Sequence, residues 1–400
     1  MLARPTPPRQ PKCASARLVS NAVTDVAALP AAPAPLPSAA RLAAWRPEFW
    51  ATGGATLLLL PLCWLLERGL GLERAELAVG FLAFHAAHVI NDPHFAVTYL
   101  LFYRGFGDRL RSREVPLAQR LRYLGAGLVA PLLLMLWASH ALVTGSARSL
   151  GLMTQLMFLL VGWHYVKQGF GVATVLSARR GIGYGAWERR AILAHCFAGW
   201  AYAWSSPFDP GRLVEEKGVV YATLPHPDWL EPLSFAVFVL SAALLAAVLG
   251  VKWRRERTLP LSPLIGMLVT VWLWVVYSGI DPLFMYLIPA LHSIQYLYFV
   301  YLLKRNQARA HEGPPEFGRP PGVVLGAWLA GSIALGLLLF HFLPGALDTA
   351  LVDRRAAHSS DLGATPYFAA LFVIVNVHHY FMDAALWRRE NSDTHYLREA

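Results

Sequence analysis

Residues 231–251 read EPLSFAVFVLSAALLAAVLGV, and this stretch decides the fold class. It holds a single charged residue, Glu231, and as an α-helix it is long enough to cross about 30 Å of hydrocarbon. Further apolar stretches of this kind lie near residues 52–70, 75–103, 121–143, 150–177, 190–206, 261–279, 283–303, 323–343 and 366–387. We therefore expect an all-α polytopic membrane bundle of about ten transmembrane helices.

The composition agrees with a membrane protein. Of the 400 residues, 56% are hydrophobic and only 15% are charged, whereas a soluble domain carries about 25% charged residues. These values argue against a soluble multidomain enzyme and against a disordered chain. The three cysteines, Cys13, Cys63 and Cys196, form no CxxC motif, so a disulfide-stabilised secreted scaffold is also disfavoured.

The first 45 residues differ from the rest of the chain. They are rich in proline, alanine and arginine, as in RPTPPRQPK (4–12) and LPAAPAPLPSAA (29–40), and have no apolar signal-peptide segment near Met1. We expect a disordered cytoplasmic tail over 1–45. The transmembrane bundle is expected over 46–390, followed by a second cytoplasmic tail over 391–400.

Basic residues gather in alternate loops of the predicted bundle. The formal net charge is +10, and arginine and lysine concentrate in residues 104–122, 179–190, 252–257 and 304–319. The loops between these segments are neutral, mixed or acidic. Because cytoplasmic loops carry the excess of positive charge, this pattern predicts a multi-pass membrane protein with both termini in the cytoplasm. The positive charge is accounted for in this way, and we expect no nucleic-acid partner.

Histidines are the polar residues that stand out within the apolar stretches. Seven of them fall inside predicted helices: His85, His88, His94, His164, His292, His378 and His379. An ionisable residue at membrane depth costs free energy unless it is paired or faces a cavity. The four helices that carry them are even-numbered and cross in the same direction. By helical rise, most of these residues lie roughly 14 to 21 Å from the outer end, so we expect one histidine layer near the midplane.

Each of these helices carries a second polar residue at helical spacing. Three or four residues separate the partners, which places them on one helix face. The pairs are His88 with Asp92, His164 with Gln168, His292 with Gln295, and His379 with Asp383. A buried metal ion needs several neutral imidazoles together with groups that hold the tautomer of each ring. The pattern therefore indicates a metal centre.

We expect one ligand from each helix. The first choices are His88, His164, His292 and His378, with His85, His94 and His379 as further candidates. Asp92 and Asp383 would ligate the metal or orient imidazoles, and Gln168 and Gln295 would orient them. A set of histidines with carboxylates favours iron, while zinc, copper and haem stay open.

Structural roles are the competing interpretation for several polar residues. His195 and His341 stand alone in the sequence and are expected to be interhelical hydrogen-bond partners. Asp92 precedes Pro93, so it is also a candidate cap at a helix kink. For Lys167 we expect snorkelling toward the interface, with binding of an anionic head group or a cofactor as the alternative. The aromatic residues around Tyr296 fit an interfacial belt, with the lining of a channel for a long apolar substrate as the alternative.

Short motifs in the same helices resemble those of the Brp/Blh family, integral-membrane iron oxygenases that cleave β-carotene. His378, Asp383 and Arg388 stand in the relation found in the last helix of that family. The residues His292-Ser293-Ile294-Gln295 look like the family's HSxxH motif, with Tyr296 in place of the second histidine. HVINDPH (88–94) stands for the family's opening motif. The resemblance implies one iron held by histidines from several helices.

These observations predict a membrane metal-dependent oxygenase, or a related redox enzyme, that acts on a lipophilic substrate. A carotenoid, an isoprenoid or another lipid would be such a substrate, because the bilayer concentrates both lipids and O₂. The expected partners are the lipid bilayer, this hydrophobic small molecule and an electron donor. Two other classes stay open: a haem-binding electron-transfer protein, and an ion- or proton-coupled carrier.

Overall fold

A computed structural model describes residues 47–205, 212–279, 281–353 and 360–397. Seven helices in these ranges are long and apolar enough to cross a membrane: Pro47–Leu70, Leu117–Val143, Ala147–Arg179, Leu230–Glu256, Leu283–Ala310, Pro321–Leu351 and Pro366–Leu386. They indicate an integral membrane protein. The predicted tail over 1–45 lies outside the described residues.

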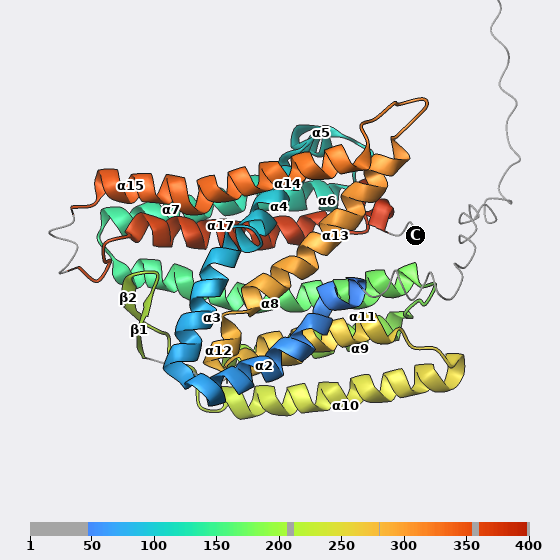
Figure 1. Ribbon diagram of the computed structural model, residues 1–400, viewed down its shortest axis with the longest axis horizontal. Helices are drawn as coiled ribbons and strands as arrows, with labels where there is room; N and C mark the ends of the chain where they lie inside the picture. The colour runs from blue at the N-terminus through green and yellow to red at the C-terminus, as the bar shows by residue number, and fades with distance from the viewer. Residues whose placement is uncertain (1–46, 206–211, 280, 354–359, 398–400) are drawn as a thin grey trace, which may run out of the picture. The chain divides into compact units, whose positions relative to one another are not determined.

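The seven long helices are built from the following elements. They comprise η1 (Trp50–Gly54) and α2 (Ala55–Leu70); α6 (Leu117–Leu124), η2 (Gly125–Val129) and α7 (Ala130–Val143); α8 (Ala147–Arg179); α10 (Leu230–Glu256); α12 (Pro282–Met285) and α13 (Ile288–Ala310); α14 (Pro321–Leu337), η5 (Leu338–Phe342) and α15 (Leu343–Leu351); and α17 (Pro366–Leu386). Helix α8 contacts α7, α9, α11 and α17, which gives it a central place in the bundle (Figure 1).

The other three predicted spans fold differently, so ten crossings stay a prediction. The stretch 75–103 is two helices, α3 (Leu72–Ala87) and α4 (Asn91–Tyr103), followed by the short α5 (Phe106–Arg111). The chain breaks just ahead of Pro93, a residue that a helix tolerates in its first turn but not in its interior. The other two are α9 (Ala186–Ser205) and the shorter apolar segment formed by α11 (Leu261–Leu268), η3 (Val269–Val276) and η4 (Tyr277–Gly279).

The described chain contains one small β-hairpin beside its helices. Strands β1 (Leu213–Glu216) and β2 (Val219–Ala222) pair antiparallel, with Glu216 opposite Val219. Lys217 and Gly218 form the turn with φ of 53° and 81°, a conformation that glycine adopts without steric cost. Strand β2 packs against α8, so the hairpin lies at the end of the bundle where α8 begins.

Buried apolar side chains of the described residues form four clusters, and two of them flank His164 along α8. On α8, Leu150 and Met157 belong to the first cluster, and Val172 and Leu176 to the second. On α17 the first cluster extends to Tyr380, next to His379, and the second begins at Met382. The fold therefore holds His164 and His379 in the apolar interior.

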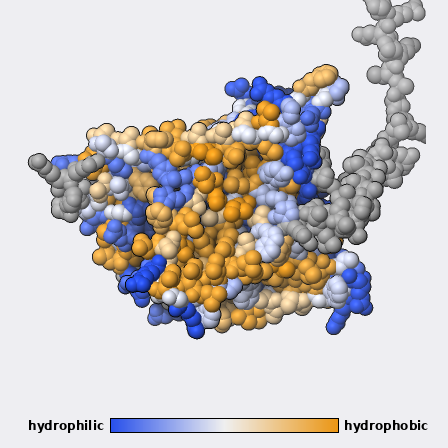
Figure 2. Space-filling model, in the orientation of Figure 1, coloured by the Kyte–Doolittle hydropathy of each residue, from blue (hydrophilic) through white to orange (hydrophobic). Residues whose placement is uncertain are grey.

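The visible surface is largely apolar. Figure 2 shows hydrophobic residues over most of one face and hydrophilic residues gathered toward its ends. Large apolar side chains such as Leu77, Phe81 and Leu240 are at least 65% exposed. Exposed apolar area on this scale requires a nonpolar surrounding, in agreement with a lipid-facing surface.

The C-terminal residues fold against the bundle, contrary to the tail expected over 391–400. Residues Ser392–Leu397 form η6, which contacts α13. Asn306 donates a hydrogen bond to the carbonyl of Tyr396 at 2.8 Å, and Arg179 donates to the carbonyl of Leu397 at 2.8 Å. These bonds and the burial of Leu397 hold the segment against the bundle.

Candidate metal centre

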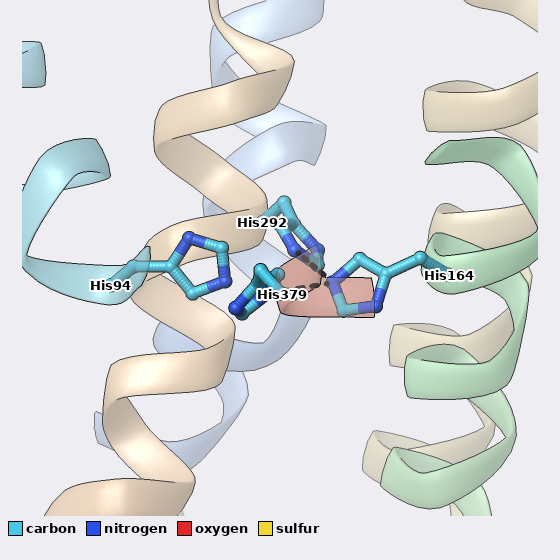
Figure 3. Close-up of side chains that lie close together, drawn as sticks. All are labelled: His94, His164, His292 and His379. Atoms are coloured by element: carbon cyan, nitrogen blue, oxygen red, sulfur yellow. Dashed lines mark hydrogen bonds between the residues drawn. The ribbon is translucent and has the colours of Figure 1, made fainter. Parts of the chain in front are cut away.

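Four histidines from four helices converge in the interior. They are His94 on α4, His164 on α8, His292 on α13 and His379 on α17. Each offers a ring nitrogen, and the four nitrogens lie within 4.8 Å of one another. All four side chains are at most 3% exposed. In Figure 3, His94 and His164 approach from opposite sides, with His292 and His379 between them.

The nitrogen–nitrogen distances match those of ligands on one ion. The Nε2 atom of His164 lies 3.0 Å from Nε2 of His292 and 3.3 Å from Nε2 of His379. Metal–nitrogen bonds of about 2.0–2.1 Å place neighbouring ligands about 3.3 Å apart in tetrahedral geometry and about 3.0 Å apart in octahedral geometry. Both distances, which also suit hydrogen bonds between the rings, are therefore compatible with ligands of one ion.

Three other ring nitrogens of the four histidines have no hydrogen-bond partner within the described chain. Nε2 of His94 and the Nδ1 atoms of His292 and His379 are buried without a partner in the described chain. Buried polar atoms are rarely left in this state without a functional reason. Protonation of the four rings would place like charges within 4.8 Å in an apolar interior, so the rings form a neutral ligand set.

The tautomer of His94 leaves Nε2 free to bind. Its Nδ1 atom lies 3.2 Å from Oγ of Ser293, and that hydroxyl donates its proton to Oδ1 of Asn91 at 3.0 Å. Since the hydroxyl proton is used, Oγ accepts from Nδ1–H of His94. Nε2 of His94 is then an unprotonated lone-pair donor that faces the other three rings.

Asp383 lies near the group, one turn along α17 from His379. Its Oδ2 atom lies 3.6 Å from Nδ1 of His164 and 4.0 Å from Nε2 of His379. Its Oδ1 atom accepts hydrogen bonds from Tyr296 at 2.7 Å and from Trp387 at 2.9 Å. Both distances from Oδ2 to the rings exceed that of a hydrogen bond. Asp383 is thus close to the group, and its role in ligating the metal or orienting imidazoles stays a prediction.

The two glutamines act on the backbone rather than on the rings. Gln168 donates to the carbonyl of His292 at 3.2 Å and to Oε1 of Gln295 at 2.8 Å. Gln295 donates to the carbonyl of Thr52 at 2.8 Å. The expectation that they orient imidazoles directly is therefore wrong. Their side-chain amides donate to backbone carbonyls and to one another, and these bonds connect α8, α13 and η1.

Three of the predicted ligands lie outside the four-histidine group. His378 contacts the hydroxyls of Tyr99 at 3.0 Å and Tyr103 at 3.3 Å, because neighbouring residues on a helix face directions about 100° apart. His85 is exposed on α3 beside Phe81. His88 stands at the end of α3, so the chain break turns it away from the direction that α4 gives to His94.

His88 belongs instead to a second group, with Asp92 and His341. Oδ2 of Asp92 lies 2.8 Å from Nε2 of His341 and 3.5 Å from Nδ1 of His88. His341 hydrogen-bonds to Asp92 on another helix, so its predicted role as an interhelical hydrogen-bond partner is confirmed. The identity of the partner was not predicted, because no local spacing links position 341 to position 92. A hydrophilic patch over the junction of α3 and α4 in Figure 2 agrees with the partial exposure of both rings.

Two other residues show how far local interpretation holds. His195 bonds to Ser241 and Trp272, each at 3.0 Å, so its predicted role as an interhelical hydrogen-bond partner is confirmed. Tyr296 is 2% exposed and bridges Thr98 and Asp383. It is therefore a buried support of the site and not part of an aromatic belt. Its place at the second histidine of the HSxxH-like motif is the one signal that marked it.

A cavity of about 630 Å³ reaches the histidine group from one side. His164, Tyr380 and Asp383 line it next to the group. Aromatic walls and cationic residues continue the lining, and they include Trp163, Phe170, Phe299, Trp387, Lys167 and Arg388. The volume lies in the range of small-molecule sites. Lys167, expected chiefly to snorkel, thus also lines this cavity.

Comparison of the chain with family models, with curated proteins and with solved structures finds no match. The resemblance to the Brp/Blh family accordingly rests on the short motifs alone. The four-histidine group and the cavity beside it are therefore the features that indicate the chemistry of this chain.

Proposed function

We propose that the four-histidine group holds one transition-metal ion and that the protein is a membrane oxygenase of lipophilic substrates. The observation that carries the proposal is the convergence of four buried, neutral imidazoles within 4.8 Å beside a cavity. A redox-active ion bound there would supply the activation of O₂. Iron is the proposed metal, because imidazole ligands suit it and the Brp/Blh-like motifs point the same way.

The chain's own residues would bind, orient and exclude water. His94, His164, His292 and His379 would hold the ion through ring nitrogens. Asp383 would keep the proton of His164 on Nδ1, and the bond from Tyr296 would hold that carboxylate in place. The two apolar clusters that flank His164 along α8 would exclude water from the reacting atoms.

The cavity supports a lipophilic substrate. Its walls include Trp163, Phe170 and Phe299, and His164 also lines it. An apolar chain entering this space would approach the ion on the side that the four rings leave open. The short spacing of the Nε2 atoms, 3.0 and 3.3 Å, favours a single ion over haem, because no porphyrin plane fits between these rings.

Purified protein in neutral detergent tests the proposal directly. We expect about one iron per chain by elemental analysis, no Soret band in the visible spectrum, and O₂ uptake when a carotenoid, an isoprenoid or a fatty acid is added with and without a reductant. Zinc or copper at the same stoichiometry would revise the metal. A chain without bound transition metal after growth and reconstitution with each of these metals would overturn the proposal.

A further inference from the structure

The cavity has an aromatic and a cationic lining. Next to the histidine group it is lined by His164, Tyr380 and Asp383. The lining also contains four cationic residues: Lys167, which lies about one helical turn after His164 on α8, and Arg189, Arg388 and Arg389. Aromatic side chains such as Phe170 and Phe299 form further walls. An occupant that satisfies this lining needs an apolar part and an anionic part.

The carboxylates of the lining do not neutralise these cations. The lining contains two, Asp383 and Glu390. Asp383 already accepts hydrogen bonds from Tyr296 and Trp387. In the part of the chain that the structure describes, neither Lys167 nor Arg388 has a carboxylate oxygen within ion-pair distance, as the recorded ion pairs involve other residues. The cavity therefore carries excess positive charge.

Lys167 is the most informative of these cations. It lies three residues after His164 on α8, about one helical turn farther along. Its Nζ atom stands 5.7 Å from the ring of Phe170, a weak contact for a half-buried ammonium group. Arg388 uses Nε for the carbonyl of Ala384 at 2.9 Å, which leaves its terminal nitrogens for another acceptor. A charge at this depth without a counter-ion is costly, and a bound anion would offset that cost.

We infer that the cavity binds an amphiphile with an anionic head group, held by Lys167 and Arg388, and an apolar chain that lies along the aromatic walls. The inference rests on the proposed function for the role of the histidine group, but binding itself requires no metal. A carboxylate and a phosphate ester share the chemistry that the two cations recognise. Long-chain fatty acids and isoprenoid phosphates are the substrate classes that follow.

Binding of labelled sixteen-carbon probes tests the inference. The full chain is placed in nanodiscs of zwitterionic phosphatidylcholine, and saturable binding of hexadecanoate, hexadecyl phosphate and hexadecan-1-ol is measured against empty discs. We expect both anions to bind at least tenfold more tightly than the alcohol. Equal affinity for the alcohol and the two anions would overturn the inference.

Substitutions separate the head-group site from general surface charge. Lys167→Gln and Arg388→Gln should each weaken binding of the anions by about tenfold, the factor that corresponds to one lost charge-assisted hydrogen bond. Both should leave binding of the alcohol unchanged, and Lys167→Arg should restore most of the affinity. Arg255→Gln is the matched control, because Arg255 is exposed at the end of α10 and does not line the cavity. If Lys167→Gln and Arg388→Gln bind the anions as Arg255→Gln does, the assignment is wrong.

Two further arms keep the outcomes distinct. If Lys167→Gln fails to accumulate, Arg388→Gln still decides, since Arg388 lies beyond the end of α17. Competition by phosphatidylglycerol in the discs would support the same anionic site with a bilayer phospholipid as its source. Binding of hexadecanoate is also measured on the unmodified chain after treatment with a chelator and should be unchanged, so that loss of the metal and failure of the head-group site are observed separately.

Discussion

Two adjacent histidines on α17 have different surroundings, although their side chains are chemically identical. His379 faces the rings of His94 and His164, with centroids 4.4 and 4.9 Å away. His378 faces two tyrosine hydroxyls. Rotation by about 100° per residue explains the difference. The pair therefore offers an internal comparison between a proposed ligand and a residue in the same helix turn.

We predict that His379→Ala loses bound metal while His378→Ala keeps it. Removal of one of four proposed ligands should weaken metal binding by more than the roughly 10- to 100-fold that loss of an outer partner costs. Metal per chain, measured on purified variants at matched expression, checks this result. Equal metal content in the two variants would contradict the assignment of His379.

Asp383→Asn should weaken metal binding by about 10- to 100-fold. The amide still accepts from Tyr296 and Trp387 through its oxygen, but it turns an NH₂ group toward Nδ1 of His164 and no longer holds the ring proton there. Chelator competition measures the affinity. Tyr296→Phe is the comparison: it removes one hydrogen bond to Asp383, worth about 1 kcal/mol. A larger loss in Tyr296→Phe than in Asp383→Asn would contradict this order.

At the scale of elements, the break between α3 and α4 decides which histidine of the stretch 75–103 enters the site. A continuous helix would align His88 with Asp92 and carry His85 on the same side. The break ends α3 before His88, and α4 begins a new direction at Asn91. Helix α4 then packs against α13, α14 and α17. This packing places His94 among the other three histidines of the candidate metal centre. His88 instead contacts the ring of His341.

The contact between α4 and α14 depends on a small residue. A Cβ atom on Gly336 would stand 2.9 Å from the carbonyl carbon of Asp92 and 3.0 Å from its Cβ. Close approach of helices in membranes commonly requires glycine in this way. Gly326, on the same helix, has nothing within 4 Å of such an atom.

We therefore predict that Gly336→Ala destabilises the protein by about 1–3 kcal/mol, as overpacking does. Gly326→Ala should be neutral or stabilising by up to about 1 kcal/mol, because alanine is the better helix former. Thermal unfolding in detergent compares the two. Similar unfolding temperatures for both variants would show that α4 and α14 separate without cost.

At the scale of the whole molecule, the first and last described residues meet at the same end of α8. Glu48 forms an ion pair with Arg180, and the carbonyl of Leu397 accepts from Arg179. The β-hairpin lies at the opposite end of α8, where a Cβ atom on Gly151 would contact the ring of Tyr221. We therefore expect an even number of membrane crossings.

We predict that both termini lie on the cytoplasmic side and the hairpin on the other. The measurement uses reporters fused to each end of the full chain and an epitope inserted between Lys217 and Gly218. The basic loops predict which side of the membrane the termini face. The contacts at Arg179 and Arg180 bring the two ends of the described chain together and so predict an even number of crossings. If the reporters place the two termini on opposite sides, the number of crossings is odd and the prediction is wrong.

The sequence by itself determined the class of the protein and the helices of the candidate site. Apolar length and charge alternation are local properties, so they predict an all-α membrane bundle without knowledge of the packing. The same holds for the polar residues within apolar stretches, which marked α4, α8, α13 and α17. Asp383 was also found in this way, because its spacing from His379 lies within one helix.

Only the tertiary structure decided which side chains meet. Helix rotation selected His379 over His378, and the break before α4 selected His94 over His88. The pairing of Asp92 with His341 and the support of Asp383 by Tyr296 join residues far apart in the chain. No spacing in the sequence encodes such contacts, since they depend on how each helix is rotated and where it crosses its neighbours. The cavity that joins Lys167 and Arg388 to His164 has the same origin.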